Sequence, residues 1–357
     1  MYSFFLPNIS HCLHFKILSI ESLRSSAKVL AKTLAHKYKQ STAEMTPWGS
    51  LVHRSVEAWD PLTQTGHAIE KEVLQKCTSL DEFLCKGSAN PMFWFFQRRA
   101  AFLSQKTMPK WSSDRLDDYV LLPASNGFVK RTECFFVSHF WQTKDHPDPN
   151  GEYLHLLQEN LRLQTWSYIW IDWTCIPQYP RSQKEEAYFL RTLQTMSGII
   201  RNSGFVWFYP PFEARMWILY EVAEYTLTST GEFQVTTDIK EFADHVKEML
   251  QGGVRSTLNK HGYTCTYDRD KEFLTSWLEV LVLLRRLRVN IYDVRRLLDY
   301  LTWLPSARSI FMYTIDGPVE LLRYEGTLIL GGERYTFTPF PKWEEGKYSA
   351  NATSEIA

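Results

Sequence analysis

Short apolar runs alternate with amphipathic stretches through the middle of the chain. Short apolar runs bounded by polar residues favour buried strands, and apolar residues spaced three or four apart favour helices. The predicted elements are strands at 134–137, 169–171, 205–209 and 233–235 and helices at 185–200 and 215–227. Strand, helix, strand in this order implies crossover connections. We therefore expect the first three strands to be adjacent and parallel in one sheet with helices on its faces, an α/β core.

The pattern before this region is mainly helical. Apolar residues repeat at helical spacing in two segments, and the dense apolar and aromatic stretch at 92–103 predicts a buried helix. The two repeats are Leu23, Ala27, Leu30 and Leu34, followed by Ile69, Val73 and Cys77.

The pattern after this region is helical and then β. Asp238 and Glu241 have the spacing of a helix N-cap pair, and amphipathic stretches at 273–287 and 291–301 predict two long helices. Gly331-Gly332 between two strand-like runs predicts a hairpin. The chain thus divides into a helical N-terminal extension at 1–130, an α/β core at 131–236, and a helical region ending in a β-hairpin at 237–357.

Charge and cysteine content argue against several classes of function. The chain has 40 basic and 40 acidic residues, whereas a protein that binds a phosphate backbone usually has a basic excess. Six cysteines are scattered, without a CxxC pair or a Cys/His set at zinc-ligand spacing. No apolar run has the length of a membrane helix. We therefore expect a cytoplasmic protein with reduced thiols, no metal site, no membrane span and no nucleic-acid partner.

Polar side chains follow each of the three predicted parallel strands. In an open parallel sheet, ligands bind at the carboxyl ends of the strands, near a switch in strand order. The candidate residues are Ser138, His139 and Trp141 after the first strand, Asp172 and Trp173 after the second, and Arg215, Trp217 and Glu221 on the helix after the third. We expect these side chains to lie at one edge of the sheet.

Each candidate also has a structural interpretation. Ser138 and Asp172 could cap local turns, and His139 could be a hydrogen-bonded structural histidine. Glu221 lies in an apolar helix, where a carboxylate must pair, protonate or face a cleft. Arg215 could be its partner. Cys175, which follows the second strand, is interpreted as a small buried residue, with an unrelated hydrolase using Cys175 or Ser138 as a remote alternative.

Four motifs in this order resemble the heterokaryon-incompatibility (HET) domain of fungal proteins, which is similar to the TIR fold. HET domains carry segments such as SHCWG, YLWIDALCIDQ and RGWTLQE, with an acidic and apolar helix before the last. The matching segments here are VSHFWQ (137–142), YIWIDWTCIPQ (168–178), KEEAYFLRTLQTM (184–196) and RMWILYE (215–221). The resemblance covers about 131–230 and departs from the pattern at Gln142 and Pro177.

This resemblance implies a TIR- or flavodoxin-like sheet and two different functions. The first is a signalling or self/non-self recognition module that acts by self-association through the α/β core, in a cell-death response, with protein partners and no required cofactor. The alternative is an NAD glycohydrolase, with NAD as substrate and Glu221 as the central residue. Asp172 would then border the nucleotide pocket, and Trp141 or Trp173 would stack on a ring of the ligand. Whether the chain is an enzyme stays open at this point.

Overall fold

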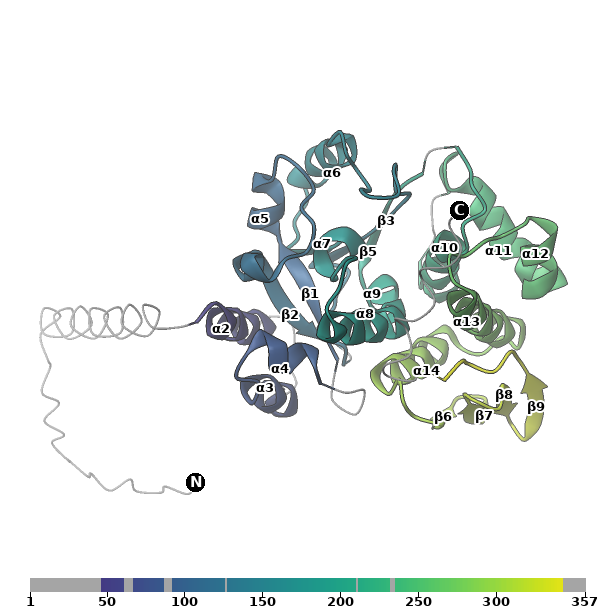
Figure 1. Ribbon diagram of the computed structural model, residues 1–357. Coiled ribbons are helices and arrows are strands. Elements are labelled where there is room, and N and C mark those ends of the chain that lie inside the picture. Colours follow the sequence, from purple (N-terminus) through teal and green to yellow (C-terminus); the bar gives the residue numbers. More distant parts are fainter. Residues whose placement is uncertain are drawn as a thin grey trace, which may run out of the picture. The chain divides into compact units, whose positions relative to one another are not determined.

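Five strands form the central sheet of the computed structural model, which describes residues 46–60, 67–86, 92–125, 127–209, 211–231 and 235–342 (Figure 1). The strands are β1 (Phe93–Arg98), β2 (Tyr119–Pro123), β3 (Cys134–His139), β4 (Tyr168–Trp170) and β5 (Gly204–Phe208), in the order β2-β1-β4-β3-β5. β3 is parallel to both β4 and β5. The prediction of three adjacent parallel strands in an α/β core is therefore confirmed.

The sheet is mixed, because β1 pairs antiparallel with both β2 and β4. The helix predicted at 92–103 is wrong: its first half is β1, and only α5 (Arg99–Ser104) is helical. Phe93 to Phe96 are all buried, so the segment shows no alternation, and periodicity cannot separate such a strand from a buried helix. The N-terminal region is thus not purely helical, since it supplies two strands of the central sheet.

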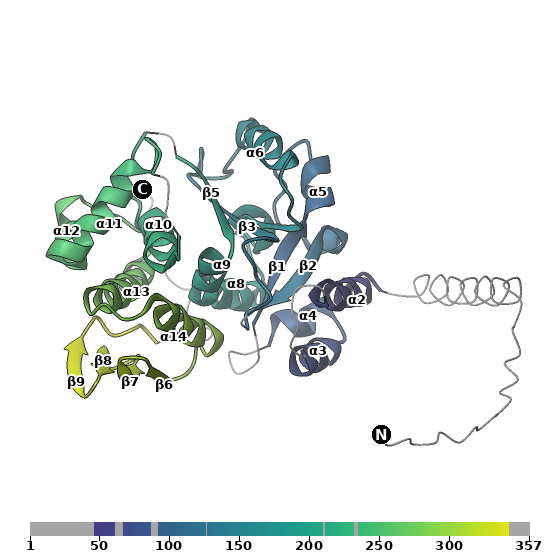
Figure 2. The same ribbon diagram turned by 180° about the vertical axis from the view of Figure 1, so that it is seen from behind.

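Helices cover both faces of this sheet (Figures 1 and 2). On one face, Val137, Ile169 and Ile171 pack with residues of α5 and α6 (Glu152–Arg162). On the other, Phe136 lies between Trp170 and Phe205, with ring centroids 5.1 Å and 5.8 Å away. That face packs against α2 (Pro47–Trp59), α4 (Leu80–Leu84), α8 (Gln183–Thr195), α9 (Ser197–Asn202) and α10 (Met216–Thr228). The connection from β3 to β4 therefore crosses one face of the sheet, and the connection from β4 to β5 crosses the other.

The remaining elements before β5 are short. They are α3 (Ala68–Gln75), the 3-10 helix η1 (Ser113–Asp118) and α7 (Asp172–Cys175). The helix predicted at 185–200 is two helices, α8 and α9, that meet at Met196. Ser182 begins α8 with a capping box in which it and Glu185 exchange hydrogen bonds. The helix predicted at 215–227 is confirmed as α10.

Between residues 237 and 342, the C-terminal region has four helices and a second sheet. The helices are α11 (Lys240–Gly252), α12 (Val254–Lys260), α13 (Asp268–Arg286) and α14 (Ile291–Trp303), and the strands are β6 (Ser309–Thr314), β7 (Gly317–Leu322), β8 (Thr327–Leu330) and β9 (Glu333–Thr336). The strands pair antiparallel in chain order. The hairpin at Gly331-Gly332 is confirmed, with φ of +58° and +90° that favour glycine at both positions.

The predicted N-cap at Asp238 is wrong. α11 begins after Ile239, without a side-chain capping bond, and the Asp238 carboxylate accepts its hydrogen bond from Thr236 instead. Two other predictions fall on residues that the structure does not describe: the helix at 23–34, and residues 233 and 234 of the strand at 233–235. Among the helices it does describe, none is both long and apolar enough to cross a membrane.

A buried ionic network joins the central sheet to the C-terminal helices. Arg201 of α9 pairs with Glu224 of α10, and both side chains are 0% exposed. Arg201 Nη2 also lies 2.7 Å from Asp299 Oδ1 of α14. Trp277 of α13 donates from Nε1 to Glu224 Oε2 over 2.7 Å. Side chains from four helices therefore meet around one guanidinium.

Candidate functional site

The candidate site lies where the loops after β3 and β5 separate. These two strands are neighbours, with His139 opposite Phe208 at their carboxyl ends. The loop after β3 leads to α6 on one face of the sheet, and the loop after β5 leads to α10 on the other. In open α/β sheets, ligands usually bind at the sheet edge between two loops that diverge in this way.

Three hydroxyl and carboxyl groups form a chain of hydrogen bonds at this edge of the sheet. Ser138, near the end of β3, donates from Oγ to Glu221 Oε2 of α10. Tyr209, which follows β5, donates from its hydroxyl to Ser138 Oγ over 2.7 Å. Ser138 is 1% exposed and Glu221 is 9% exposed. The structure thus brings together two of the predicted residues, Ser138 and Glu221, and adds Tyr209.

Glu221 has an unusual electrostatic environment. Burial raises the pKa of its carboxyl to about 8, the Ser138 hydrogen bond acts in the opposite direction, and the nearby Asp172 charge raises the pKa further. Among the residues that the structure describes, no basic side chain forms an ion pair with Glu221. Its carboxyl is therefore mostly protonated at neutral pH, and a cation placed beside it would favour the ionised form.

Arg215 is not the partner of Glu221, so that interpretation is wrong. Arg215 Nε lies 2.8 Å from Glu213 Oε2, and the guanidinium lies 4.9 Å from the centre of the Phe140 ring. The physical reason is helical geometry. Arg215 precedes α10 as its N-cap, and positions six apart on a helix do not share a face.

A second group of bonds connects the loops after β3 and β4. Asp172 Oδ1 lies 3.0 Å from His139 Nε2, and Asp172 Oδ2 accepts from Trp141 Nε1 over 3.0 Å. Its own neighbour Trp173 donates from the backbone over 2.6 Å. Burial tends to raise the pKa of Asp172, but His139 and these donors outweigh it and lower the pKa. Asp172 is thus an ionised carboxylate, and its side chain is 34% exposed.

Asp172 therefore does more than cap a turn, because its side chain ties His139 and Trp141 to the end of β4. His139 is 7% exposed and its ring is hydrogen-bonded to Asp172, so it is a structural part of the same cluster. The two clusters carry one protonated and one ionised carboxyl group at the same sheet edge. Environments that separate the pKa values of two carboxyls in this way are typical of sites that use one as an acid and the other as a charge.

The two tryptophans of the site differ in accessibility. Trp141 and Trp173 meet edge to face with ring centroids 5.2 Å apart. Trp173 is 6% exposed and donates from Nε1 to the carbonyl of Met108, whereas Trp141 is half-buried. Trp141 is therefore the ring that can offer a face to a ligand.

Trp217 belongs to neither cluster. It donates from Nε1 to Asp270 Oδ2 over 3.4 Å, a contact with α13, and its ring meets Tyr220 edge to face. Trp217 therefore helps to fix α10 against the C-terminal helices. Cys175 is fully buried, and burial raises the pKa of its thiol to about 11. A protonated, enclosed thiol is not a nucleophile, which supports the interpretation of Cys175 as a small core residue.

Sequence reasoning missed Tyr209. A tyrosine at the end of an apolar run is normally interpreted as core, and burial indeed raises its pKa well above the usual value. Tyr209 joins the cluster because it follows β5 and its hydroxyl reaches Ser138 of the neighbouring strand β3. The signal that could have found it is the polar tip that a buried tyrosine must hydrogen-bond.

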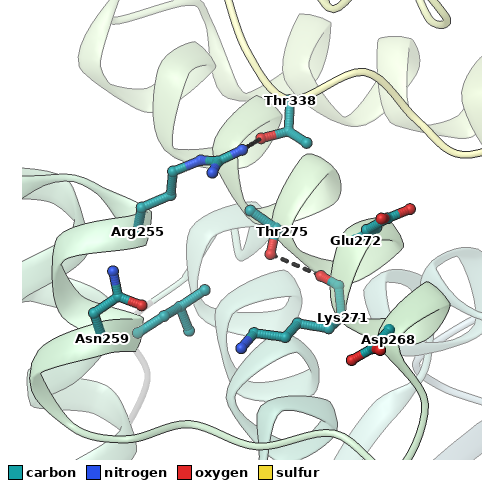
Figure 3. A pocket seen from close by; sticks show the side chains of 8 residues that line it. Arg255, Asn259, Asp268, Lys271, Glu272, Thr275 and Thr338 are labelled. Atoms are coloured by element: carbon teal, nitrogen blue, oxygen red, sulfur yellow. Dashed lines mark hydrogen bonds between the residues drawn. The ribbon is translucent and has the colours of Figure 1, made fainter.

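No metal or cofactor position is evident near these residues. Within the described ranges, His, Cys, Asp and Glu side chains do not gather in threes at positions that could hold a metal ion. A cavity of about 370 Å³ lies elsewhere, between α12, α13 and Thr338 (Figure 3). Its Arg255 is already bonded to Thr338 and Glu279, and its Asp268, Lys271 and Glu272 are exposed. We therefore assign the candidate site to the two hydrogen-bonded clusters at the ends of β3, β4 and β5 and not to this cavity.

Comparisons with known proteins returned no match to any protein-family model, to any curated protein or to any solved structure. The resemblance to HET and TIR domains consequently remains a prediction from the four motifs.

Proposed function

We propose that this chain is a HET/TIR-like protein that cleaves NAD at the bond between nicotinamide and ribose, with Glu221 as the central residue. One observation carries the proposal: the buried carboxyl group of Glu221, which has no ion pair among the described residues, lies at the carboxyl ends of parallel strands and is bonded to Ser138. A carboxyl held this way costs stability unless it is protonated, and strongly perturbed groups of this kind concentrate at functional sites.

In the proposed chemistry, the substrate supplies the positive charge that would favour the ionised form of Glu221. In NAD the nicotinamide ring is positively charged, so its approach would lower the Glu221 pKa and favour the carboxylate. As the glycosidic bond breaks, the bonding electrons leave with neutral nicotinamide and positive charge develops on the ribose. The Glu221 carboxylate would stabilise that charge, and water would then add to the ribose and release a proton. Ser138 would position the carboxylate through its hydrogen bond.

The second cluster would hold the rest of the ligand. Asp172 is the exposed carboxylate of the site and could accept hydrogen bonds from ribose hydroxyls. Trp141 could stack on a ring of the nucleotide. Because Ser138 and Glu221 are buried, the substrate would reach them only when the loops after β3 and β5 move apart. Closure of the loops over the bound substrate would then exclude water, as in many enzymes.

The test is release of free nicotinamide from NAD by the purified full chain. We expect wild type to release nicotinamide and Glu221→Gln to lose activity by a factor of about 10² to 10³, the usual effect of removing one such electrostatic contact. Glu213→Gln is the matched control, since Glu213 is an exposed glutamate just before the same helix, and it should keep the wild-type rate. A wild-type protein that never consumes NAD would contradict the proposal.

A second candidate function is a cytoplasmic recognition module that acts by self-association. The observation in its favour is a group of exposed apolar side chains on the C-terminal sheet, including Phe311, Tyr313 and Ile315. Contiguous exposed apolar surface is typical of protein interaction sites.

A further inference from the structure

The C-terminal sheet has one face in the core and one face outward. Its inward residues are Ile310, Met312, Val319, Leu321 and Leu328, all buried. α14 lies against β6, and both views place β6 to β9 beside α13 and α14 (Figures 1 and 2). An antiparallel sheet with one buried face normally alternates, with polar residues on the outward side.

The outward face breaks this rule. Phe311 is 56% exposed, Tyr313 is 72% exposed, and Ile315 in the turn after β6 is 84% exposed. The outward positions of the next strands include Leu322 and Ile329. Six of the twelve large hydrophobic side chains that the described chain exposes lie between 292 and 315. We call the outward side chains of β6 to β9 the outer face.

Charges on the outer face are arranged in a row across the four strands. Phe311 pairs in register with Glu320, Glu320 with Ile329, and Ile329 with Arg334. Glu320 and Arg334, which carry opposite charges, thus lie on either side of Ile329. In the part of the chain that the structure describes, neither Glu320 nor Arg334 forms an ion pair with another side chain.

We propose that the outer face binds the outer face of a second copy of this chain. A twofold axis parallel to the strands would place β6 of one copy over β9 of the other, and β7 over β8. Arg334 would then face Phe311 of the second copy, a cation–π contact. In that second copy, Glu320 would lie next to this Phe311, one strand spacing of about 4.8 Å along the sheet. The same contacts occur twice, as a twofold interface requires.

A second copy fits this surface because the surface is complementary to itself. It offers an aromatic patch, an unpaired acid and an unpaired base in one row, so a copy supplies what each group lacks. Four strands of this length span about 20 Å by 20 Å, or about 400 Å² per copy. That is below the roughly 800 Å² per partner of a standard stable interface. The dimer should therefore be weak and depend on protein concentration.

This inference does not rest on the proposed NAD chemistry, and it gives the recognition function a surface outside the α/β core. The test is the mass of the full chain in solution, by light scattering and sedimentation from about 1 to about 100 µM, around the Kd of a weak interface. We expect the mass to rise from the 42.0 kDa of one chain towards twice that value. Nicotinamide release is measured on the same samples, so that failure of one proposal is distinct from failure of the other.

Charge reversal makes the test specific. Glu320→Arg and Arg334→Glu should each be monomeric, because each places like charges together. An equal mixture of the two variants should dimerise again, since every Arg then meets a Glu. Glu159→Arg, on an exposed glutamate of α6, is the matched control and should dimerise like wild type.

Removal of the aromatic rings provides a second test. Phe311→Ser with Tyr313→Ser should lower the dimer affinity at least tenfold, whereas Leu163→Ser, at a leucine 94% exposed beyond α6, should not change it. A wild type that stays monomeric throughout would overturn the proposal. So would a dimer that persists in both charge variants, because association would then use another surface.

Discussion

Glu221 and Glu224 lie three residues apart on the same helix, and they belong to two different regions of the molecule. Glu224 is 0% exposed and lies in the ionic network with Arg201, Asp299 and Trp277. Glu221 is 9% exposed, its hydrogen bond comes from the neutral hydroxyl of Ser138, and the described part of the chain gives it no ion pair. Burial is similar, whereas the partners differ.

The difference shows how a buried carboxyl can be structural or available for chemistry. Burial alone would lower the pKa of Arg201, but Asp299 and Glu224 outweigh it and raise the pKa. Burial raises the pKa of Glu224 as well, but Arg201 and the indole N–H of Trp277 act against that rise, so the carboxylate has charged and polar partners. Glu221 has no such compensation and is held protonated by burial. A ligand changes the ionisation of a carboxylate that already has a cationic partner only slightly. A carboxyl without such a partner can lose its proton when a cationic ligand approaches.

The largest expected effect is on the structural side of this comparison. Arg201→Met removes the cation and leaves Glu224 and Asp299 without their partner in a buried position. Breaking a buried ion pair from one side typically costs about 3 to 5 kcal/mol. Unfolding in denaturant should show this loss. Arg215→Met is the control, because Arg215 pairs with Glu213 at the surface, and it should cost less than about 1 kcal/mol. Equal losses for the two variants would contradict the distinction.

Trp277 is expected to give the next largest effect. It is 1% exposed and its indole N–H is bonded to Glu224. Trp277→Ala should cost about 3 kcal/mol or more from lost burial. Trp277→Phe keeps most of the ring and removes the donor, so it should cost about 1 to 2 kcal/mol. If chemical melts put the alanine variant within about 1 kcal/mol of wild type, α13 would not be part of the core.

The raised pKa of Glu221 should be detectable in the way the free energy of unfolding changes with pH. Its pKa is about 8 in the folded chain and about 4.3 when unfolded. Between these values the folded state holds a proton that the unfolded state has lost, so stability falls as pH rises. Wild type should therefore lose about 1.4 kcal/mol per pH unit relative to Glu221→Gln around pH 6 to 7. Glu213→Gln should keep the wild-type slope. Parallel curves for wild type and Glu221→Gln would mean that Glu221 is ionised and compensated.

The sequence predicted the parallel strands well because each is a short apolar run between helical stretches. It failed at β1, whose apolar residues are all buried and so show no alternation. It identified Ser138 and Glu221 as neighbours through the rule that ligands bind at strand carboxyl ends. It could not identify the partners of Glu224. Arg201 bonds to groups 23 and 98 residues away, and spacing along the chain holds no information about such contacts.

The proposed function requires that Glu221 serves chemistry and not stability. The most direct test measures nicotinamide release and thermal unfolding on the same preparations of wild type and Glu221→Gln at neutral pH. We predict that wild type releases nicotinamide from NAD and that the variant loses this activity while melting at the same or a higher temperature. A variant that melts several degrees lower, or that cleaves NAD at the wild-type rate, would contradict the claim.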